Sequence, residues 1–388
     1  MDDCILTINV GSATLKFALF QKNKDLTKIC SGDLNNRSRT LSIFDKDSNK
    51  PIQRKVIEGK HSLLQPKYLF KWIKHNYPNV NIKIIGHRLV HGGKVFLQPT
   101  LITKPVLSQL KKLIPLAPLH MPHEVGFVEK ILLEFPKILQ AACFDTSFHR
   151  VQPRLATLFA IPRKYTEEDG IIRYGFHGLS YEYIAEKLSQ YTNKTKLKKV
   201  IVAHLGNGAS LCAMHKNKSV ATSMGFSALD GLIMGTRCGN IDPGVLLYLM
   251  QEKGLSVKEL ERILYKESGL LGVSGITNDM KELIESKDPK AKEAVDLFCY
   301  RAIREIGSLV ATLEGLDVLV FTGGIGEHAA VIRDKICEHL GWLGMTIDFS
   351  KNKCNSLSIT APTSRVEVHV IPTNEEFMIA KHVYGLIK

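Results

Sequence analysis

Two arginines stand in stretches that hold glycine and apolar residues instead of acids. Arg88 lies in a glycine-flanked run at 86–93, and Arg237 follows Gly235 in a stretch without other charges. A guanidinium removed from water requires an anionic partner, and its planar fork matches the oxygens of a carboxylate or a phosphoryl group. Each arginine alone could pair with a structural carboxylate, but the two together indicate a site for an anionic substrate.

The stretch from Asn9 to Lys16 could bind phosphate. An extended backbone after Gly11 places two hydroxyls and one ammonium on the same face, from Ser12, Thr14 and Lys16, because strand side chains alternate. The alternate positions 15, 17 and 19 are apolar and can enter a core. Hydroxyls, backbone N–H groups and lysine all bind phosphate oxygens, although an ordinary turn with a solvated lysine is the alternative.

Two further glycine-rich turns follow strand-like runs. The turn at 204–210 contains Gly206 and Gly208, and the turn at 322–329 contains Gly324 and Gly326 and opens a helix. Glycines let backbone donors approach a ligand, and a helix N-terminus favours an anion. A tight hairpin is the alternative for the first turn.

The turn at 322–329 also fits a dinucleotide-binding fingerprint. Its spacing is Gly324-x-Gly326-x-x-Ala329, and Asp348 follows roughly 20 residues later, where an acid would bind a ribose. An NAD-dependent dehydrogenase is therefore the alternative from another class of enzyme. Against it, the motif lies near the C-terminus without a sufficiently long strand–helix–strand unit after it, and the chain has no Walker A motif.

Other polar residues occupy positions that suit catalysis or metal binding. Asp145 ends an apolar run, His177 stands between an aromatic residue and a glycine, and Glu375 lies where a strand gives way to the last helix. Glu375 could favour the helix N-terminus or reach Mg²⁺. His120 and His123 form a His-x-x-His pair, but no companion spacing supports a transition-metal site.

Strand-like and helix-like segments alternate, which predicts an α/β architecture. The expected strands are 4–10, 15–20, 82–85, 200–204, 318–321 and 366–371, and the expected helices are 106–113, 181–188, 291–313 and 377–386. Segments 5–19 and 200–214 both read as strand, glycine-containing turn and strand. They are either two ordinary hairpins or a duplicated domain with two phosphate-binding turns.

Composition narrows the class of protein. The 388 residues are 44% hydrophobic and suffice for two or three domains. The net charge of +14 comes from scattered lysines, which suits anionic small molecules and gives no basic stripe for nucleic acid. Eight cysteines without a CxxC pair suit a reducing compartment. No targeting segment and no apolar run of ~20 residues is apparent, so we expect a cytoplasmic protein without a membrane span.

Taken together, nine stretches resemble the acetate kinase family, in the same order from Ile8 to about Ala380. They are Asn9–Lys16, Gly86–Arg88, Pro118–His120, Phe144–Thr146, Arg173–Gly178, His204–Gly208, Met234–Arg237, Gly324–Glu327 and Pro372–Glu376. The resemblance implies an α/β fold of two duplicated actin-like (ribonuclease H-like) ATPase domains around a nucleotide cleft, as in sugar kinases, Hsp70 and actin. It implies a first domain of 1–147 plus 376–388, a second of 148–375, and a homodimer.

The same resemblance implies reversible transfer of the ATP γ-phosphoryl group to acetate, giving acetyl phosphate and ADP. Arg88 and Arg237 would hold the carboxylate and the phosphoryl group, with His177 and Asp145 also catalytic. Asn9 and Glu375 would position Mg²⁺, with Mn²⁺ as an alternative. The nucleotide-binding residues would be Ser12, Thr14, Lys16, His204, Gly206, Asn207, Gly208, Asp279, Lys281, Gly324, Gly326 and His328. The acyl pocket would be formed by Arg88, Val90, Leu119, Phe176 and Ala228.

Several positions depart from the family pattern. Ala13, Lys281 and His328 differ on the nucleotide side, which leaves the nucleotide preference open. Ala228 stands where proline is usual and could enlarge the acyl pocket, whereas Val90 is the residue associated with acetate. One methylene in an apolar pocket discriminates by only ~1–3 kcal/mol. We therefore expect acetate as the preferred substrate, with propionate as the alternative.

Overall fold

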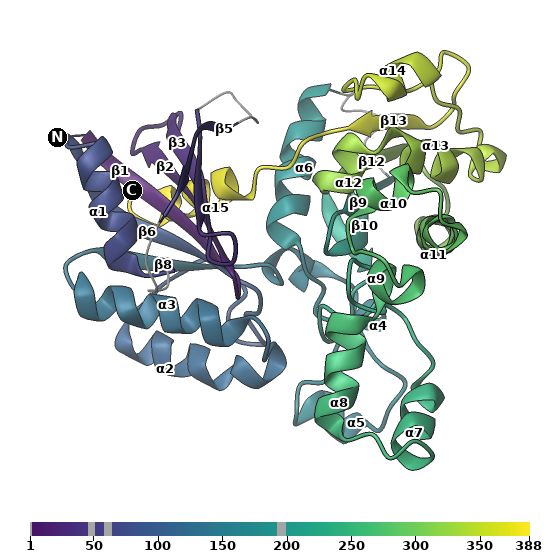
Figure 1. Ribbon diagram of the computed structural model, residues 1–388, viewed down its shortest axis with the longest axis horizontal. Coiled ribbons are helices and arrows are strands. Elements are labelled where there is room, and N and C mark those ends of the chain that lie inside the picture. Colours follow the sequence, from purple (N-terminus) through teal and green to yellow (C-terminus); the bar gives the residue numbers. More distant parts are fainter. Residues whose placement is uncertain (1, 46–50, 58–63, 192–198) are drawn as a thin grey trace. The chain divides into compact units, whose positions relative to one another are not determined.

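The computed structural model describes residues 2–45, 51–57, 64–191 and 199–388, which form two compact units (Figure 1). Unit 1 comprises Met1–Ser147 and Asn374–Lys388, and unit 2 comprises Phe148–Thr373. The last helix, α15 (Glu375–Leu386), therefore returns to unit 1 and brings Glu375 with it. Both units combine a mixed sheet with helices, so the α/β prediction is confirmed.

Unit 1 contains an eight-stranded sheet in the order β5-β4-β3-β2-β1-β6-β8-β7. Its strands are β1 (Asp2–Val10), β2 (Thr14–Gln21), β3 (Lys28–Asn35), β4 (Thr40–Phe44), β5 (Pro51–Val56), β6 (Val80–Leu89), β7 (Thr100–Leu101) and β8 (Leu139–Phe144). Its other helices are α1 (Pro66–Asn76), α2 (Lys104–Lys112), the 3₁₀ turn η1 (Ile114–Leu116) and α3 (Met121–Glu134).

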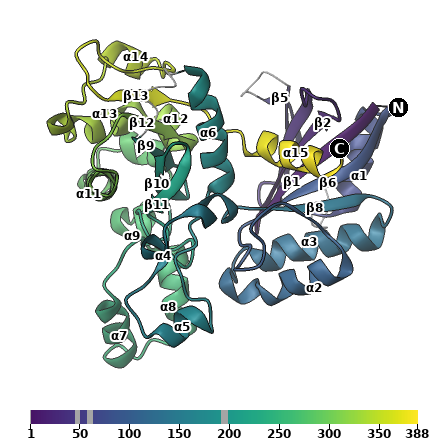
Figure 2. The same cartoon turned by 180° about the vertical axis from the view of Figure 1, so that it is seen from behind.

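Helices cover both faces of the unit 1 sheet. Leu69 of α1 and Phe127 of α3 join the core cluster that contains Leu6 and Ile8 of β1. On the other face α15 lies across β1 and β6 (Figure 2). Gly86 permits this approach, because a Cβ there would lie 2.4 Å from a methyl carbon of Ile379. The strands are therefore apolar on both faces where helices cover them.

Unit 2 contains a five-stranded sheet in the order β11-β10-β9-β12-β13. Its strands are β9 (Lys199–Leu205), β10 (Ala209–His215), β11 (Lys218–Thr222), β12 (Val318–Thr322) and β13 (Glu367–Val370). Its helices are α4 (Arg154–Thr157), α5 (Arg163–Glu167), α6 (Gly178–Tyr191), α7 (Pro243–Gln251), α8 (Val257–Arg262), α9 (Gly269–Ser274), α10 (Met280–Glu285), α11 (Pro289–Leu313), α12 (Gly323–His328), α13 (Ala330–Glu338) and α14 (Phe349–Lys353). Shorter turns are η2 (Ser147–Val151), η3 (Ile263–Glu267) and η4 (Gly341–Leu343).

The two sheets repeat one topology. The central strands of unit 1, β3-β2-β1-β6-β8, correspond in order to β11-β10-β9-β12-β13 of unit 2. In both, a β-hairpin (β1 with β2, β9 with β10) is followed by a parallel neighbour (β6, β12). The hairpins at 5–19 and 200–214 are therefore equivalent parts of a duplicated domain, which settles the alternative left open by the sequence.

The expected strands and helices are all present, mostly with longer boundaries. The segment 82–85 is the centre of β6, and 181–188 is the centre of α6. Leu15 and Phe17 of β2 are buried in the unit 1 core, and Lys16 is exposed between them as the alternation predicts. Ser12 precedes β2 and lies in the turn. Among the residues that the structure describes, no helix has the length and apolarity needed to cross a membrane.

Candidate active site

Arg88 is the centre of a polar cluster in unit 1. It lies near the end of β6, and Asp145 directly follows the parallel strand β8, so both reach the same edge of the sheet. Arg88 Nε donates to Asp145 Oδ1 at 2.9 Å and Nη2 donates to Oδ2 at 2.5 Å. The Asp145 side chain is 1% exposed. This two-bond pairing orients the guanidinium and holds its charge in place.

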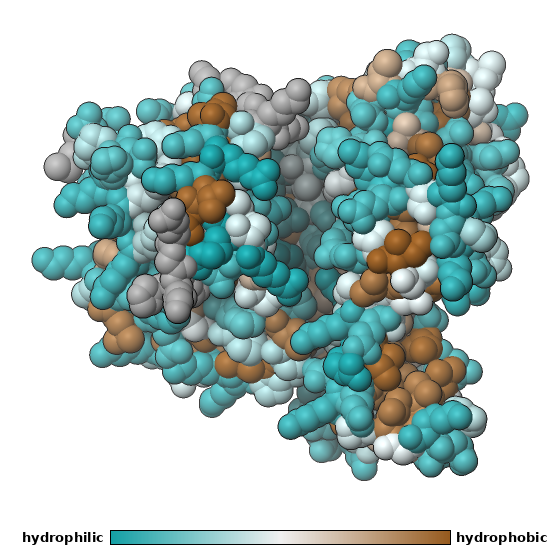
Figure 3. Space-filling view, in the orientation of Figure 1, coloured by the Kyte–Doolittle hydropathy of each residue, from teal (hydrophilic) through white to brown (hydrophobic). Residues whose placement is uncertain are grey.

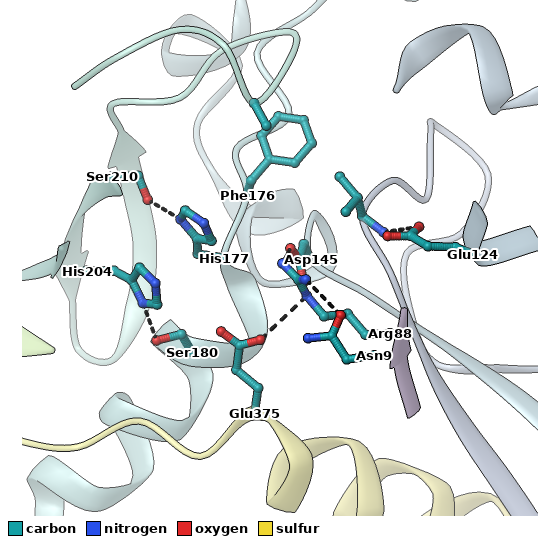
Figure 4. Close-up of polar contacts among 12 residues, drawn as sticks. Asn9, Arg88, Glu124, Asp145, Phe176, His177, Ser180, His204, Ser210 and Glu375 are labelled. Carbon is teal, nitrogen blue, oxygen red and sulfur yellow. Dashed lines mark hydrogen bonds and ion pairs between the residues drawn. The ribbon is translucent and has the colours of Figure 1, made fainter. Parts of the chain in front are cut away.

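Asn9 and Glu375 contact the same guanidinium (Figure 4). Arg88 Nη1 donates to Asn9 Oδ1 at 3.2 Å, and Nε lies 3.5 Å from Glu375 Oε2. Burial lowers the pKa of Arg88, but the charges of Asp145 and Glu375 outweigh it and raise the pKa above its ordinary value. Four residues that the sequence singled out therefore meet in unit 1, around a guanidinium that stays charged.

The oxygens of Asn9 and Glu375 suit a hard cation. Amide and carboxylate oxygens are ligands that Mg²⁺ accepts, and both side chains converge on one guanidinium. Across the described residues, no group of three or more His, Cys, Asp or Glu side chains could hold a metal.

Glu124 of α3 also lies in this region, although it was not among the residues predicted from the sequence. Its Oε2 accepts the Val90 backbone N–H at 2.9 Å, and the residue is 3% exposed. Burial raises the pKa of Glu124 to about 8, against the lowering effects of the Val90 N–H and Arg88. The sequence signal that could have identified Glu124 is a carboxylate between Met121 and Val125, on a face of α3 that is otherwise apolar.

The buried carboxyl group of Glu124 predicts a pH-dependent stability. Its pKa is about 8 in the folded protein and ordinarily 4.5, so the native state binds the proton more tightly. The unfolding free energy should therefore fall as pH rises from 4.5 through 8, by up to ~1.4 kcal/mol per pH unit.

The Glu124→Gln substitution gives a neutral side chain whose amide oxygen can still accept the Val90 N–H. Denaturant titrations of both proteins at several pH values should give a flatter stability profile for the variant, with its largest advantage at the alkaline end. Two profiles that stay parallel across this range would contradict a raised pKa at Glu124.

The proposed acyl-pocket residues are divided between the units. Val90 is buried and Leu119 half-buried in unit 1, while Phe176 is buried and Ala228 half-buried in unit 2. The Phe176 carbonyl oxygen lies 2.9 Å from His149 Nε2. Burial lowers the pKa of His149 to about 4, so this imidazole is neutral and holds the Phe176 backbone as a hydrogen-bonding group.

The β9–β10 turn of unit 2 is held by two neighbouring segments. Gly235 N donates to Asn207 O at 3.0 Å, and Asn278 Nδ2 donates to Asn207 Oδ1 at 3.1 Å. A Cβ on Gly206 would lie 3.9 Å from Gly324 N. The two glycine-rich turns of unit 2, far apart in sequence, therefore lie side by side.

A cavity of about 900 Å³ opens beside these two turns. Six of the predicted nucleotide-binding residues line it: Gly206, Asn207, Asp279, Lys281, Gly324 and His328. The predicted residues His204, Gly208 and Gly326 belong to unit 2 but are not in this lining, and Ser12, Thr14 and Lys16 belong to unit 1. The volume is ample for a small organic ligand.

The dehydrogenase interpretation finds no support in this geometry. Asp348, the acid expected on a ribose, accepts the Lys351 N–H at 3.0 Å and caps α14. It is not among the residues that line the cavity beside Gly324. Gly323, just before the fingerprint, turns the chain from β12 into α12 with φ +76, a backbone conformation that favours glycine.

His177 and Arg237 converge on Gly208. A Cβ at Gly208 would lie only 3.2 Å from both His177 Nε2 and Arg237 Nη2, so the absence of a side chain lets both nitrogens approach this turn. Arg237 Nη1 also donates to Ala228 O at 2.7 Å, which fixes the orientation of the guanidinium plane. A guanidinium and an imidazole that meet beside a glycine turn are groups suited to bind an anion such as a phosphoryl group.

A second polar cluster contacts His177 and consists of Ser210, His204 and Ser180 (Figure 4). His177 Nδ1 lies 2.8 Å from Ser210 Oγ, and its ring stacks on that of His204 with centroids 4.3 Å apart. His204 Nδ1 in turn lies 2.9 Å from Ser180 Oγ. His204, predicted as a nucleotide ligand, therefore packs against His177 here. Neither Ser180 nor Ser210 was predicted as a site residue, because each looks like an ordinary small residue of a helix or a strand.

Comparisons with known proteins agree along the whole chain. The model of the acetokinase family matches residues 4–381. An acetate kinase of Rhodopseudomonas palustris (strain TIE-1) is 48% identical over 394 residues, covering 100% of this chain and 99% of that protein. The structure is similar to a propionate kinase of Francisella tularensis (TM-score 0.88, 38% identity, 98% of each chain). It is also similar to an acetate kinase of Porphyromonas gingivalis (TM-score 0.87, 32% identity, 100% of each chain).

Proposed function

Because the chain belongs to the acetokinase family, we propose a phosphoryl-transfer mechanism for its candidate active site. Its activity is that of an acetate kinase, a phosphotransferase with a carboxyl group as acceptor, and the dehydrogenase alternative is wrong. The convergence of His177 Nε2 and Arg237 Nη2 on Gly208 is the observation that carries the residue assignment. Phosphoryl transfer needs little covalent chemistry from a protein, mainly alignment and neutralisation of charge.

Arg88 binds the acetate carboxylate in this mechanism. A carboxylate is already ionised and nucleophilic at neutral pH, so the reaction requires no strong general base. Asp145 acts on the guanidinium, since both of its oxygens accept from Arg88 and keep the fork in one orientation. One acetate oxygen attacks the γ-phosphorus, the bond to the β–γ bridging oxygen breaks, and ADP carries away that oxygen's charge.

His177 and Arg237 bind the transferring phosphoryl group. Its three equatorial oxygens carry the negative charge of the transition state, and preorganised donors stabilise that charge most. Arg237 supplies a permanent positive charge, while His177 supplies a directed N–H. The hydrogen bond from Arg237 Nη1 to Ala228 O orients the guanidinium.

We propose that ATP occupies the cavity beside the two glycine turns of unit 2. Gly206 and Gly324 give backbone donors access to the phosphates, and Asp279 and Lys281 lie at the start of α10, where they would contact the nucleoside. Asp279 accepts the Lys281 N–H at 2.8 Å, so its position is fixed by the helix cap. Ser12, Thr14 and Lys16 remain proposed phosphate contacts of unit 1.

Asn9 and Glu375 would hold Mg²⁺, with Mn²⁺ as the alternative. Their oxygens are suitable ligands, and the cation would neutralise phosphate charge when it enters with the nucleotide. Arg88 contacts both residues, so it keeps these oxygens in place.

Turnover with several carboxylates tests the proposed substrate. Purified protein with ATP and Mg²⁺ should form acyl phosphate, trapped as the hydroxamate, with a higher kcat/KM for acetate than for propionate or butyrate. A propionate preference would reassign the substrate and keep the mechanism. Absence of acyl phosphate from all three acids, and of ATP formation in the reverse direction, would refute the proposed function.

Val90→Ala should shift the acid preference toward propionate. The Val90 side chain is 4% exposed, and its replacement removes two methyl groups from the proposed pocket wall. A methylene in such a pocket discriminates by ~1–3 kcal/mol, so the ratio of kcat/KM for propionate to acetate should rise about tenfold or more. Leu133→Ala, a highly exposed leucine of α3, is the control and should leave this ratio unchanged. An unaltered ratio in Val90→Ala would remove Val90 from the pocket.

We also propose a homodimer in the cytoplasm. Helix α7 has no buried residue although its sequence is apolar, and Leu247 and Tyr248 are 57% and 53% exposed (Figure 3). An exposed apolar surface of this kind is typical of a subunit interface. Sedimentation should give twice the monomer mass, and Leu247→Glu should shift it toward the monomer.

All eight cysteines are free thiols, which suits the reducing cytoplasm.

A further inference from the structure

Two buried polar side chains form a hydrogen-bonded chain that ends on His177 in unit 2. The Tyr181 hydroxyl lies 2.5 Å from Ser210 Oγ, and Ser210 Oγ lies 2.8 Å from His177 Nδ1. Tyr181 belongs to α6 and Ser210 to β10, and both are completely buried. The proposed function uses His177 but gives no role to the other two residues.

The direction of these hydrogen bonds follows from the number of protons. Within the described part of the chain, Ser210 Oγ is the hydrogen-bond partner of the Tyr181 hydroxyl. If Ser210 donated to Tyr181, the phenol proton would point into the core without an acceptor, which costs ~1–3 kcal/mol. Tyr181 therefore donates to Ser210. Burial also raises the pKa of Tyr181 well above its ordinary value, so the phenol keeps its proton.

Ser210 then has one proton left, and it goes to His177. A hydroxyl carries a single proton, so a serine that accepts from Tyr181 is free to donate to Nδ1. A neutral imidazole has one donor and one acceptor nitrogen, and with Nδ1 as acceptor the ring proton must be on Nε2. Nε2 is the atom that approaches Gly208 together with Arg237 Nη2.

We propose that Tyr181 and Ser210 are positioning residues that hold His177 in the Nε2–H tautomer, as a hydrogen-bond donor to the transferring phosphoryl group. This inference rests on the proposed role of His177. The other tautomer would direct a lone pair at the phosphoryl oxygens, where it would repel the charge that the site has to stabilise.

The backbone around His177 has an unusual conformation that its neighbours hold in place. His177 has φ 58, a left-handed conformation that few residues other than glycine adopt, and Gly175 has φ 73. A Cβ on Gly175 would lie 2.6 Å from the ring of His149, which also bonds the Phe176 carbonyl at 2.9 Å. A strained backbone that is held by its surroundings is typical of a residue whose orientation matters.

Nitrogen NMR of the histidine rings tests the tautomer directly. Two-bond ¹H–¹⁵N correlations of the ¹⁵N-labelled protein, with the His177 signals assigned from a His177→Gln spectrum, should show a protonated Nε2 and an unprotonated Nδ1 when the ring is neutral. Tyr181→Phe and Ser210→Ala should both increase the Nδ1–H population, because neither keeps a serine proton committed to Nδ1. A wild-type ring protonated on Nδ1, or a ring whose tautomer neither variant alters, would overturn the proposal.

Kinetics show whether the tautomer matters to the reaction. Loss of one oxyanion donor costs ~10²–10³ in kcat, so a partial loss of the correct tautomer should lower kcat about 10- to 100-fold in Ser210→Ala. The KM for acetate should change less than about threefold, since Arg88 and not His177 binds that substrate in the ground state. Tyr183→Phe removes a phenol from the same helix and should leave both the tautomer and kcat unchanged.

The same variants separate this proposal from the proposed role of His177. If His177→Ala retains full kcat, the assignment of His177 is wrong and no kinetic effect of Ser210 can be attributed to the tautomer. If His177→Ala is inactive while Ser210→Ala and Tyr181→Phe keep the wild-type kcat and tautomer, His177 is catalytic and the positioning role of Tyr181 and Ser210 is refuted.

Discussion

Arg88→Ala should lower kcat/KM for acetate by about 1,000-fold or more, because the proposed site would lose the only group assigned to the substrate carboxylate. A hydrogen bond to a charged group contributes ~1.5–3 kcal/mol, so the loss of two such bonds to the carboxylate accounts for an effect of this size. The change also leaves the Asp145 carboxylate, which is 1% exposed, without the guanidinium that bonds both of its oxygens. Steady-state acyl phosphate formation measures the loss of activity, and urea unfolding measures the stability.

Two further variants separate charge from geometry at this position. Arg88→Lys keeps the positive charge but cannot make two parallel bonds to Asp145, so its activity should lie between those of wild type and Arg88→Ala. Removing one partner of a buried ion pair costs ~3–5 kcal/mol. Adding Asp145→Asn to Arg88→Ala should recover much of this stability without recovering activity. An Arg88→Ala enzyme within tenfold of wild type would show that acetate binds elsewhere.

The sequence predicts most of the chemistry of this protein because its chemical groups lie in short, local patterns. Arg88 and Arg237 were recognisable from the absence of neighbouring acids, and the glycine turns from their position after apolar strands. The two strand–turn–strand segments left two interpretations open, a pair of ordinary hairpins or a duplicated domain, and the repeated strand order supports the duplication. These features depend on neighbours in sequence, which is why they could be found without a structure.

What the sequence could not predict are contacts between residues far apart in the chain. Glu124 and Val90 are 34 positions apart, and Ser210 and His177 are 33 positions apart. Their residue types are ordinary for a helix and a strand, so only the folded chain shows that they support site residues. The prediction that Asp348 binds a ribose was wrong for the opposite reason. Its spacing in the sequence matched the fingerprint, but in the fold its carboxylate caps a local helix.

Arg237→Ala should reduce kcat about 1,000-fold with a much smaller change in the KM for acetate. Its Nη2 approaches Gly208 together with His177 Nε2, and in the proposed mechanism these two groups face the phosphoryl oxygens as they gain charge in the transition state. An interaction that strengthens only in the transition state changes kcat far more than ground-state binding. Separate measurements of kcat and of each KM, over a range of both substrates, distinguish this from a general loss of affinity.

The matched control for Arg237 is a surface arginine of the same unit. Arg163 is 83% exposed and forms an ion pair with Glu167 of its own helix, so Arg163→Ala should keep wild-type kinetics. Arg237→Lys should recover part of kcat, since an ammonium restores the charge but cannot hold Ala228 O and a phosphoryl oxygen in one planar fork. If Arg237→Ala turns over as fast as Arg163→Ala, the phosphoryl group is stabilised by other residues, and the convergence at Gly208 is a packing feature.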